Sequence, residues 1–106
     1  MSSESNEDRI FKALAAPLRR RILDRLKQAP ESTGALCEAF PELDRCTVMQ
    51  HLGVLEEAGL VVARREGRVR WNHLNALPIV DIADRWIGSY AAYAGDKLKG
   101  LRDSLT

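Results

Sequence analysis

Two side chains in the middle of this sequence, Thr47 and Gln50, carry groups that can hydrogen-bond to the edges of nucleotide bases. Three residues apart, they fall on one side of a helix. The glutamine amide both donates and accepts, which matches the edge that adenine presents in the major groove of DNA. Met49 flanks this pair, and Gly53 carries no side chain that would limit a close approach. We expect Arg45, at the start of the same segment, to contact a phosphate.

Positioning these residues requires a helix with one face fixed to a core, and the sequence predicts such a helix over residues 45–57. An apolar stripe at the i, i+4, i+7 spacing would fix it, formed by Val48, Leu52 and Leu55. Asp44 suits the N-cap, and Gly59 suits the residue that ends the helix. The opposite face is polar and nearly uncharged, as a helix in a groove needs. Taken alone, the pattern also fits an ordinary amphipathic surface helix.

Shorter helices are predicted before this one. They cover residues 9–15, residues 18–27 and, after a cap at Ser32 or Thr33, residues up to Phe40. A tight turn at 41–43 then leads into helix 45–57. Two short helices joined by a few residues, the second with a polar outer face, form a helix-turn-helix.

A β-hairpin is predicted after Gly59, because two runs rich in valine and aromatic residues, 60–66 and 68–74, surround Gly67. Four arginines crowd its tip: Arg64, Arg65, Arg68 and Arg70. Guanidinium groups this close repel one another without an anionic partner, and arginine clasps phosphates and enters narrow minor grooves. The alternative is an edge charged to discourage strand pairing, which is usually done with lysine.

The formal net charge of +1 hides two basic blocks. Residues 9–27 carry seven basic residues against one acid, a net charge of +6, and residues 61–73 carry +3. Basic flanks around a weakly charged presenting helix are expected when the flanks contact the DNA backbone. In the first block we predict a DNA contact by Arg20. Arg19 and Arg21 could reach phosphates too, and Arg21 could instead pair with an acid inside the domain.

A long final helix is predicted from Ile79 to about Leu105, following Pro78. At about 1.5 Å per residue it spans roughly 40 Å, more than a compact domain of about 13 Å radius of gyration can cover. Its apolar residues follow a heptad-like spacing: Ile87, Tyr90, Ala94, Leu98, Leu101 and Leu105. A two-fold homodimer would bury this face, and we expect Phe11 and Leu14 to join the interface. Two presenting helices would then meet a pseudo-palindromic operator with half-sites about one turn apart.

The length of 106 residues suits a single, mostly α domain with a small β-hairpin wing. We expect a disordered acidic tail over 1–7, a winged helix-turn-helix core over 8–77 and the dimerisation helix over 78–106. No apolar run approaches the roughly 20 residues of a membrane helix, and the N-terminus does not resemble a secretory signal. Two cysteines without export signals predict a reducing, cytoplasmic location.

Three motifs in order resemble the ArsR-type winged-helix regulators. Residues 11–23 resemble the opening of that family, residues 48–61 its recognition helix and residues 64–68 its wing. The likeness covers residues 9 to about 105. It implies a homodimeric bacterial repressor of transcription that binds double-stranded DNA. In members of that family, a small molecule or a metal relieves DNA binding, or no effector is known. Segments 75–79 and 84–88 look like a non-metal branch of the family.

Metal-sensing members of that family carry two cysteines one residue apart at the start of the third helix, where this sequence has Thr33 and Ala35. Its own candidate soft ligands are Cys37, Cys46, His51 and His73. Five residues apart on one helix, Cys46 and His51 are turned about 140° from each other. We therefore predict no metal site and no cofactor. Cys46 beside Arg45 keeps one other option, an acidified thiol whose oxidation would disturb DNA binding.

Three further residues have structural rather than chemical roles in this interpretation. His51 lies beside the core stripe, so we predict a packed, hydrogen-bonded histidine, and Trp71 and Trp86 are expected in the core or the dimer interface. A winged helix used only for protein–protein contact is the alternative function, and the four wing arginines count against it. An enzyme is not predicted, because the sequence has no nucleophile–base pair, phosphate loop or paired catalytic carboxylates.

Overall fold

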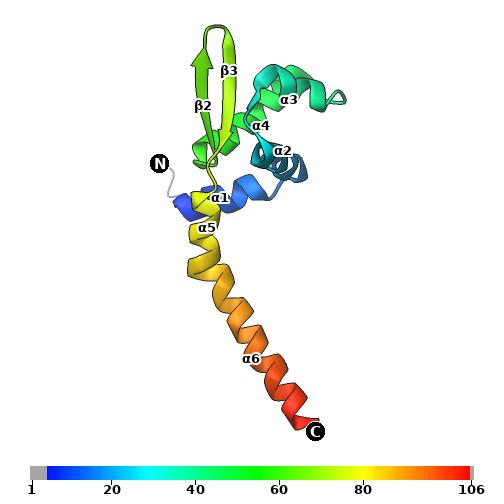
Figure 1. Ribbon diagram of the computed structural model, residues 1–106, viewed down its shortest axis with the longest axis vertical. Coiled ribbons are helices and arrows are strands. Elements are labelled where there is room, and N and C mark those ends of the chain that lie inside the picture. Colours follow the sequence, from blue (N-terminus) through cyan, green and yellow to red (C-terminus); the bar gives the residue numbers. More distant parts are fainter. Residues whose placement is uncertain (1–4, 106) are drawn as a thin grey trace.

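The protein is an elongated molecule of 64 × 34 × 23 Å, with a helical body, a projecting β-hairpin and a long helix that leaves the body on the opposite side from the hairpin (Figure 1). The structure is a computed structural model and describes residues 5–105. Its elements are α1 (Asn6–Leu14), α2 (Pro17–Gln28), β1 (Glu31–Ser32), α3 (Thr33–Ala39), α4 (Arg45–Glu57), β2 (Val61–Glu66), β3 (Val69–Leu74), α5 (Leu77–Ile82), the π-helical turn η1 (Ala83–Ile87) and α6 (Gly88–Ser104). The predicted fold class, mostly α with a β-hairpin wing, is confirmed.

Helix α1 begins earlier than predicted, because Ser5 and Asp8 form a capping box. The Ser5 hydroxyl accepts from the Asp8 backbone N–H at 3.1 Å, and the Asp8 carboxylate accepts from the Ser5 N–H at 3.5 Å. Asn6 and Glu7 are consequently helical, so the expected tail over 1–7 was too long at its C-terminal end. The rest of that predicted tail, residues 1–4, lies outside the described residues.

The predicted caps of α3 and α4 are confirmed. Ser32 caps α3 by accepting from the Ala35 N–H at 3.0 Å, and Asp44 caps α4 by accepting from the Thr47 N–H at 2.7 Å. The Thr47 N–H also lowers the pKa of the Asp44 carboxyl. Gly59 follows α4 with a φ of 75°, a conformation that L side chains rarely adopt. The helix therefore has the bounds that the sequence predicts.

The wing belongs to a three-stranded antiparallel sheet with the order β1-β3-β2. The predicted hairpin is confirmed, with Val61 opposite Leu74 and Glu66 opposite Val69. The sequence did not predict β1, whose two residues are too few to show a strand's alternation. The buried side chain of Asn72 helps to hold β1, because its Nδ2 donates to the Glu31 carbonyl at 3.2 Å.

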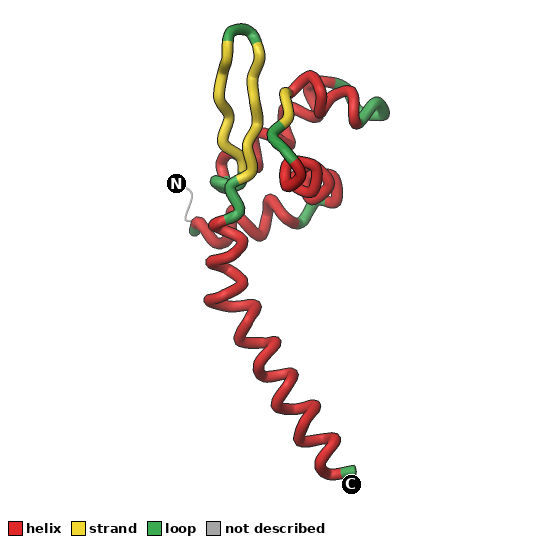
Figure 2. Tube along the Cα trace, in the orientation of Figure 1, coloured by secondary structure: helices red, strands yellow, loops and turns green. Residues whose placement is uncertain are grey.

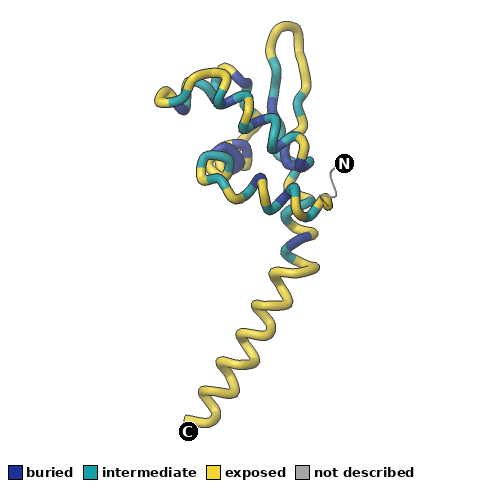
Figure 3. The backbone as a smooth tube through the Cα atoms, turned by 180° about the vertical axis from the view of Figure 1, so that it is seen from behind, coloured by how far each residue is buried: buried dark blue, intermediate teal, exposed yellow. Residues whose placement is uncertain are grey.

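The core lies where α1–α4 meet the base of the wing, and Ile82 of α5 joins it. Figure 3 shows the buried residues in this body and at the start of the long helix. The predicted α4 stripe of Val48, Leu52 and Leu55 is completely buried. Around it pack Ile22 and Leu26 of α2, with Leu36, Phe40 and Leu60 among others. Helix α4 is thus fixed along one face, and its other face is left for contacts outside the core.

The long C-terminal segment is not the uninterrupted α-helix predicted over 79–105. It follows one helical path (Figure 2), but a π-helical turn, η1, separates α5 from α6. Gly88 permits this turn, because a Cβ at that position would lie 2.8 Å from the carbonyl oxygen of Ala83. The overhang is confirmed, since all of α6 is exposed and the radius of gyration is 18.1 Å. Among residues 5–105, no helix combines the length and the apolar character that crossing a membrane requires.

Candidate nucleic-acid interface

The outer face of α4 presents the residues that the sequence assigned to base recognition. Gln50 is exposed and Thr47 half-buried, on the side opposite the buried stripe. A Cβ built on Gly53 would meet nothing within 4 Å, so no packing inside the chain requires glycine there. This face therefore combines hydrogen-bonding groups with an open surface, which is what a helix in the major groove needs.

A groove of about 300 Å³ separates the N-terminal half of α4 from the wing. Arg45 and Met49 of α4 line one side of it. The other side consists of wing residues: Arg65, Arg68, Val69 and Arg70. Ser32, Thr33 and Gly34, at the N-terminus of α3, also line it. Four guanidinium groups thus meet in one groove, and a site of this charge attracts phosphate.

Arg70 departs from the expectation of four free arginines at the wing tip. It is half-buried and forms an ion pair with Glu56 near the end of α4. Its Nε is buried and has no hydrogen-bond partner among the described residues. Arg70 therefore ties β3 to α4. This pair could not be predicted from the sequence, because the two residues are 14 positions apart.

The remaining wing arginines are exposed. Arg64 and Arg65 are neighbours on β2, so their side chains leave opposite faces of the hairpin. Arg65 shares the groove with Arg68, whereas Arg64 lies outside it. The wing thus offers cations on both faces, with two of them directed toward α4.

The basic residues at the start of α2 are engaged inside the chain. Arg20, which the sequence assigned to DNA, donates to the carbonyl oxygen of Leu14 at 2.5 Å. Arg19 donates to the carbonyls of Ala13 at 2.8 Å and Lys12 at 2.9 Å. Both guanidinium groups therefore satisfy carbonyls at the end of α1, which the sequence did not reveal.

The predicted role of His51 is confirmed, and Arg21 takes one of its two alternatives. Arg21 forms an ion pair with Glu42 at 3.7 Å, which is the alternative to a phosphate contact. Its guanidinium also lies 4.9 Å from the centre of the Phe40 ring. His51 is packed and hydrogen-bonded, since its Nδ1 lies 3.1 Å from a guanidinium nitrogen of Arg19. Burial, and secondly the charge of Arg19, lower the pKa of His51. Because arginine can only donate, Nδ1 accepts and the imidazole is neutral.

The tryptophans differ in their surroundings. Trp71 is half-buried in β3 next to β1, whereas Trp86 in η1 is exposed. Trp86 contacts Phe11 edge to face with ring centres 5.5 Å apart, and Tyr90 with ring centres 5.2 Å apart. Leu14, the other α1 residue expected at the dimer interface, is partly buried against the core.

The soft ligands do not converge. Cys37 is half-buried in α3 and Cys46 is exposed in α4. Among residues 5–105, no three histidine, cysteine or acidic side chains lie close enough to hold a metal ion together. Thr33 stands where the metal-sensing members described above carry a cysteine. It is buried and accepts a hydrogen bond from Asn72 at 3.1 Å.

Comparison with known proteins agrees with this geometry. A helix-turn-helix domain model matches residues 14–64. The chain is 36% identical over 88 residues to an uncharacterized HTH-type transcriptional regulator of Bacillus subtilis, YuzN, and the match covers 77% of this chain and 96% of that protein. The crystal structure of an ArsR family transcriptional regulator, RHA00566, matches with a TM-score of 0.77 at 27% identity, covering 86% of this chain and 98% of the other.

The chain belongs to the ArsR-type winged helix-turn-helix regulators. It is a DNA-binding transcriptional regulator, and this family is not one of enzymes. The chain is also similar to the transcriptional repressor SdpR of Bacillus subtilis, with 32% identity over 72 residues, which cover 68% of this chain and 79% of SdpR. Within the family fold, α4 is the recognition helix and β2–β3 the wing.

Proposed function

We propose that this regulator is a homodimeric repressor that binds a pseudo-palindromic operator, with α4 in the major groove and the wing on the adjacent backbone or minor groove. One observation carries the proposal: the exposed polar face of α4 borders a groove lined by four arginines. Base-reading groups and phosphate-binding groups thus lie side by side on one surface, the combination that specific DNA binding requires.

Thr47 and Gln50 are the proposed base contacts. Both lie on the outer face of α4, and the amide of Gln50 can pair with adenine in two hydrogen bonds. Met49, at the groove, offers an apolar contact for a thymine methyl group, and Gly53 allows the helix to approach the bases closely.

Arg45, Arg65 and Arg68 are the proposed phosphate contacts inside the groove, and Arg64 is a further one on the outer face of the wing. Arg70 acts differently, because its ion pair with Glu56 sets the position of the wing relative to α4. Arg20 contributes its positive charge near the DNA while its guanidinium caps α1. The direct contacts are therefore a smaller set than the sequence suggests.

Dimerisation is proposed through the exposed apolar face of α6 and η1. Ile87, Leu98 and Leu101 are 49%, 66% and 59% exposed, and Tyr90 and Ala94 continue the same stripe. Such a stripe is rarely left in water, and a second copy of the same helix would cover it. Phe11 extends this face through its contact with Trp86. The similarity to SdpR, a repressor, supports repression as the outcome of DNA binding.

Selection of binding sites from random double-stranded DNA with the purified protein tests the proposal. We expect enrichment of a two-fold sequence whose half-sites are about one helical turn apart. The Thr47→Ala, Gln50→Ala double variant should keep its helical circular dichroism and lose the enriched sequence. Failure of the parent protein to enrich any sequence would contradict the proposal and favour a module for protein–protein contact.

A further inference from the structure

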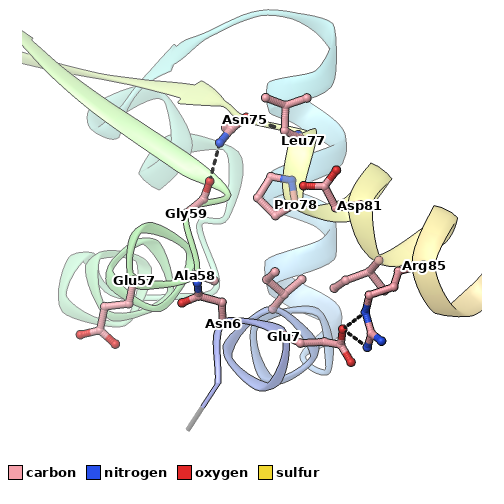
Figure 4. Close-up of a pocket in the computed structure, with 12 residues that line it drawn as sticks. Asn6, Glu7, Glu57, Ala58, Gly59, Asn75, Leu77, Pro78, Asp81 and Arg85 are labelled. Atoms are coloured by element: carbon pink, nitrogen blue, oxygen red, sulfur yellow. Dashed lines mark hydrogen bonds and ion pairs between the residues drawn. The ribbon is translucent and has the colours of Figure 1, made fainter.

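The π-helical turn η1 joins the DNA-binding body to the long helix, and two of its neighbouring residues contact α1. Arg85 forms an ion pair with Glu7, and its Nε donates to the Glu7 carboxylate at 2.8 Å (Figure 4). Trp86 contacts Phe11 edge to face, with ring centres 5.5 Å apart. Glu7 and Phe11 are four positions apart, so they lie on one face of α1. The two contacts together fix η1 to one side of the body.

Helix α1 is in turn fixed to the recognition helix. Ile10 and Ala13 of α1 are buried in the same core cluster as Val48 and Leu52 of α4. Ile82, the last residue of α5, is buried in that cluster too. Up to η1, the long helical segment is therefore anchored to the body that carries the recognition helix, whereas every residue of α6 beyond it is exposed.

A π-helical turn changes the direction in which every later side chain points. It holds one residue more than an α-helical turn, and each residue advances an α-helix by about 100°. The residues after η1 are therefore rotated about the helix axis by about 100° relative to an uninterrupted α-helix. This rotation decides on which side of the long helix the exposed stripe of α6 lies, which consists of Tyr90, Ala94, Leu98 and Leu101.

Gly88 allows η1 to form. Its backbone N–H donates to the carbonyl oxygen of Ala83, five residues earlier, which is the hydrogen bond of a π-helical turn. A Cβ built on Gly88 would lie 2.8 Å from that same oxygen, closer than Cβ atoms come to backbone atoms in folded proteins. Gly95 and Gly100 differ, since a Cβ on either would meet nothing within 4 Å. Of the three glycines in α6, Gly88 alone is required by the atoms around it.

We propose that η1 sets the rotation of α6 relative to the recognition helix, and that Gly88 thereby determines which spacing of operator half-sites the dimer accepts. The inference rests on the proposed function, since it takes the stripe of α6 as the interface between two copies. The two-fold axis of the dimer then passes through that stripe. Rotating the stripe by about 100° moves this axis around the long helix, and so changes the distance and the relative direction of the two copies of α4. Half-sites that fit one arrangement do not fit the other.

The turn is tested first without DNA, so that failure here is separate from failure of the proposed function. Gly88→Ala and its matched control, Gly95→Ala, make the same chemical change on the same helix. Both should keep their helical circular dichroism in the far ultraviolet. Only Gly88→Ala should change the near-ultraviolet spectrum, because converting η1 into α-helix rotates Trp86 away from Phe11. A near-ultraviolet spectrum of Gly88→Ala identical to that of the parent would overturn the proposal, whether or not the protein binds DNA.

Half-site spacing is then measured by fluorescence anisotropy, on the selected operator and on versions whose half-sites are moved apart or together in single-base-pair steps. The parent and Gly95→Ala should prefer the selected spacing. Gly88→Ala should bind the selected operator about tenfold more weakly, because its two recognition helices cannot engage both half-sites at once, and it should prefer another spacing. An unchanged preference in a dimeric Gly88→Ala would retain the proposed function and overturn the role of Gly88. A parent that neither dimerises nor selects an operator would contradict the proposed function and the spacing role together, and the near-ultraviolet result would still decide the turn.

Deleting one residue of the turn should restore the parent's preference. Asp84 is an exposed residue of η1, and removing it from Gly88→Ala takes away the extra residue of the turn. An uninterrupted α-helix then directs the stripe of α6 to the side where η1 directs it in the parent. Gly88→Ala with Asp84 deleted should therefore regain the parent's preferred spacing and most of its affinity. A loss that persists in this combined variant would show that Gly88→Ala acts through general destabilisation, and it would overturn the proposal.

Discussion

Arg19 and His51 form a hydrogen bond that connects the N-terminal helices to the recognition helix. A guanidinium nitrogen of Arg19 lies 3.1 Å from Nδ1 of His51 in α4, and the same guanidinium donates to the carbonyls of Lys12 and Ala13 at the end of α1. One side chain on α2 thus fixes the position of α4 relative to α1. Since α1 also contacts η1 through Phe11 and Trp86, this connection reaches the long helix.

The surroundings of His51 make the stability of the protein depend on pH. Burial and the Arg19 charge lower the pKa of His51 in the folded protein, while in the unfolded chain it stays near its usual value of about 6.5. Folding therefore favours the neutral imidazole. Its contribution to stability is fully present above about pH 6.5 and is lost as the pH falls from there through the folded pKa.

We expect urea midpoints of the parent to fall between pH 7.5 and pH 5 by more than those of His51→Asn. Asparagine keeps an oxygen where Nδ1 accepts from Arg19 and does not titrate, so the variant isolates the imidazole. Equal pH dependence of the parent and His51→Asn would contradict the assigned role of His51.

Replacing Arg19 should destabilise the fold far more than replacing Arg21, two positions later on the same helix. Arg19 makes three hydrogen bonds, and its loss removes a donor from the carbonyls of Lys12 and Ala13 and from the imidazole of His51. We expect Arg19→Ala to lower the free energy of unfolding by about 2 kcal/mol. Arg21→Ala removes an exposed ion pair with Glu42 and the contact with the Phe40 ring, and should lower it by about 0.5 kcal/mol. Denaturant titration of both variants gives the comparison, and equal losses would refute it.

The sequence predicted best what depends on neighbouring residues. Asp44, the Val48 stripe and Gly59 fixed the bounds of α4, because capping and helical periodicity act within a few positions. It predicted least well the side-chain interactions between residues that are distant in the sequence and that only the fold brings together. Arg70 with Glu56 and Arg19 with His51 are separated by 14 and 32 positions, and arginine's length lets it reach many partners.

The arginines also show why the sequence assigned too many residues to the DNA contact. Charge and composition count Arg20 and Arg70 with the other basic residues, yet one caps α1 and the other holds the wing. The π-helical turn was missed for a related reason. Gly88 falls inside the helix predicted over 79–105, and nothing in the sequence pattern shows that its missing Cβ leaves room for the carbonyl of Ala83.

Gln50 and Arg68 should separate base recognition from backbone contact. Gln50→Ala is expected to lose about 1–3 kcal/mol of binding free energy on the selected operator and little on random DNA. Arg68→Ala should weaken both, and it should reduce the slope of log affinity against log salt concentration by about one. Fluorescence anisotropy at several salt concentrations measures both quantities. Identical behaviour of the two variants would refute the division between α4 and the wing.

Arg70 and Glu56 should behave as one unit that positions the wing. Arg70→Ala is expected to weaken operator binding without the change in salt slope that Arg68→Ala gives, because its charge is already paired with Glu56. Adding Glu56→Gln to Arg70→Ala should cause little further loss, since the pair is already broken. A salt slope reduced as in Arg68→Ala, or fully additive losses in the double variant, would return Arg70 to the set of direct phosphate contacts.

Leu98→Asp should convert the dimer into a monomer and weaken operator binding more than any single wing substitution. The side chain of Leu98 lies in the middle of the exposed stripe of α6, so a two-fold interface would force two carboxylates into an apolar seam. Ala92→Asp is the matched control, because it adds the same charge to the same exposed helix about 160° away from Ala94 of the stripe. Sedimentation equilibrium at micromolar concentration should find a dimer for the parent and Ala92→Asp, and a monomer for Leu98→Asp.

Both variants should retain the helix-turn-helix, since α6 contributes no residue to the buried core. Loss of affinity in Leu98→Asp therefore reports the missing second recognition helix and not unfolding. A monomeric parent that still binds a single half-site with full affinity would show that α6 has some other partner.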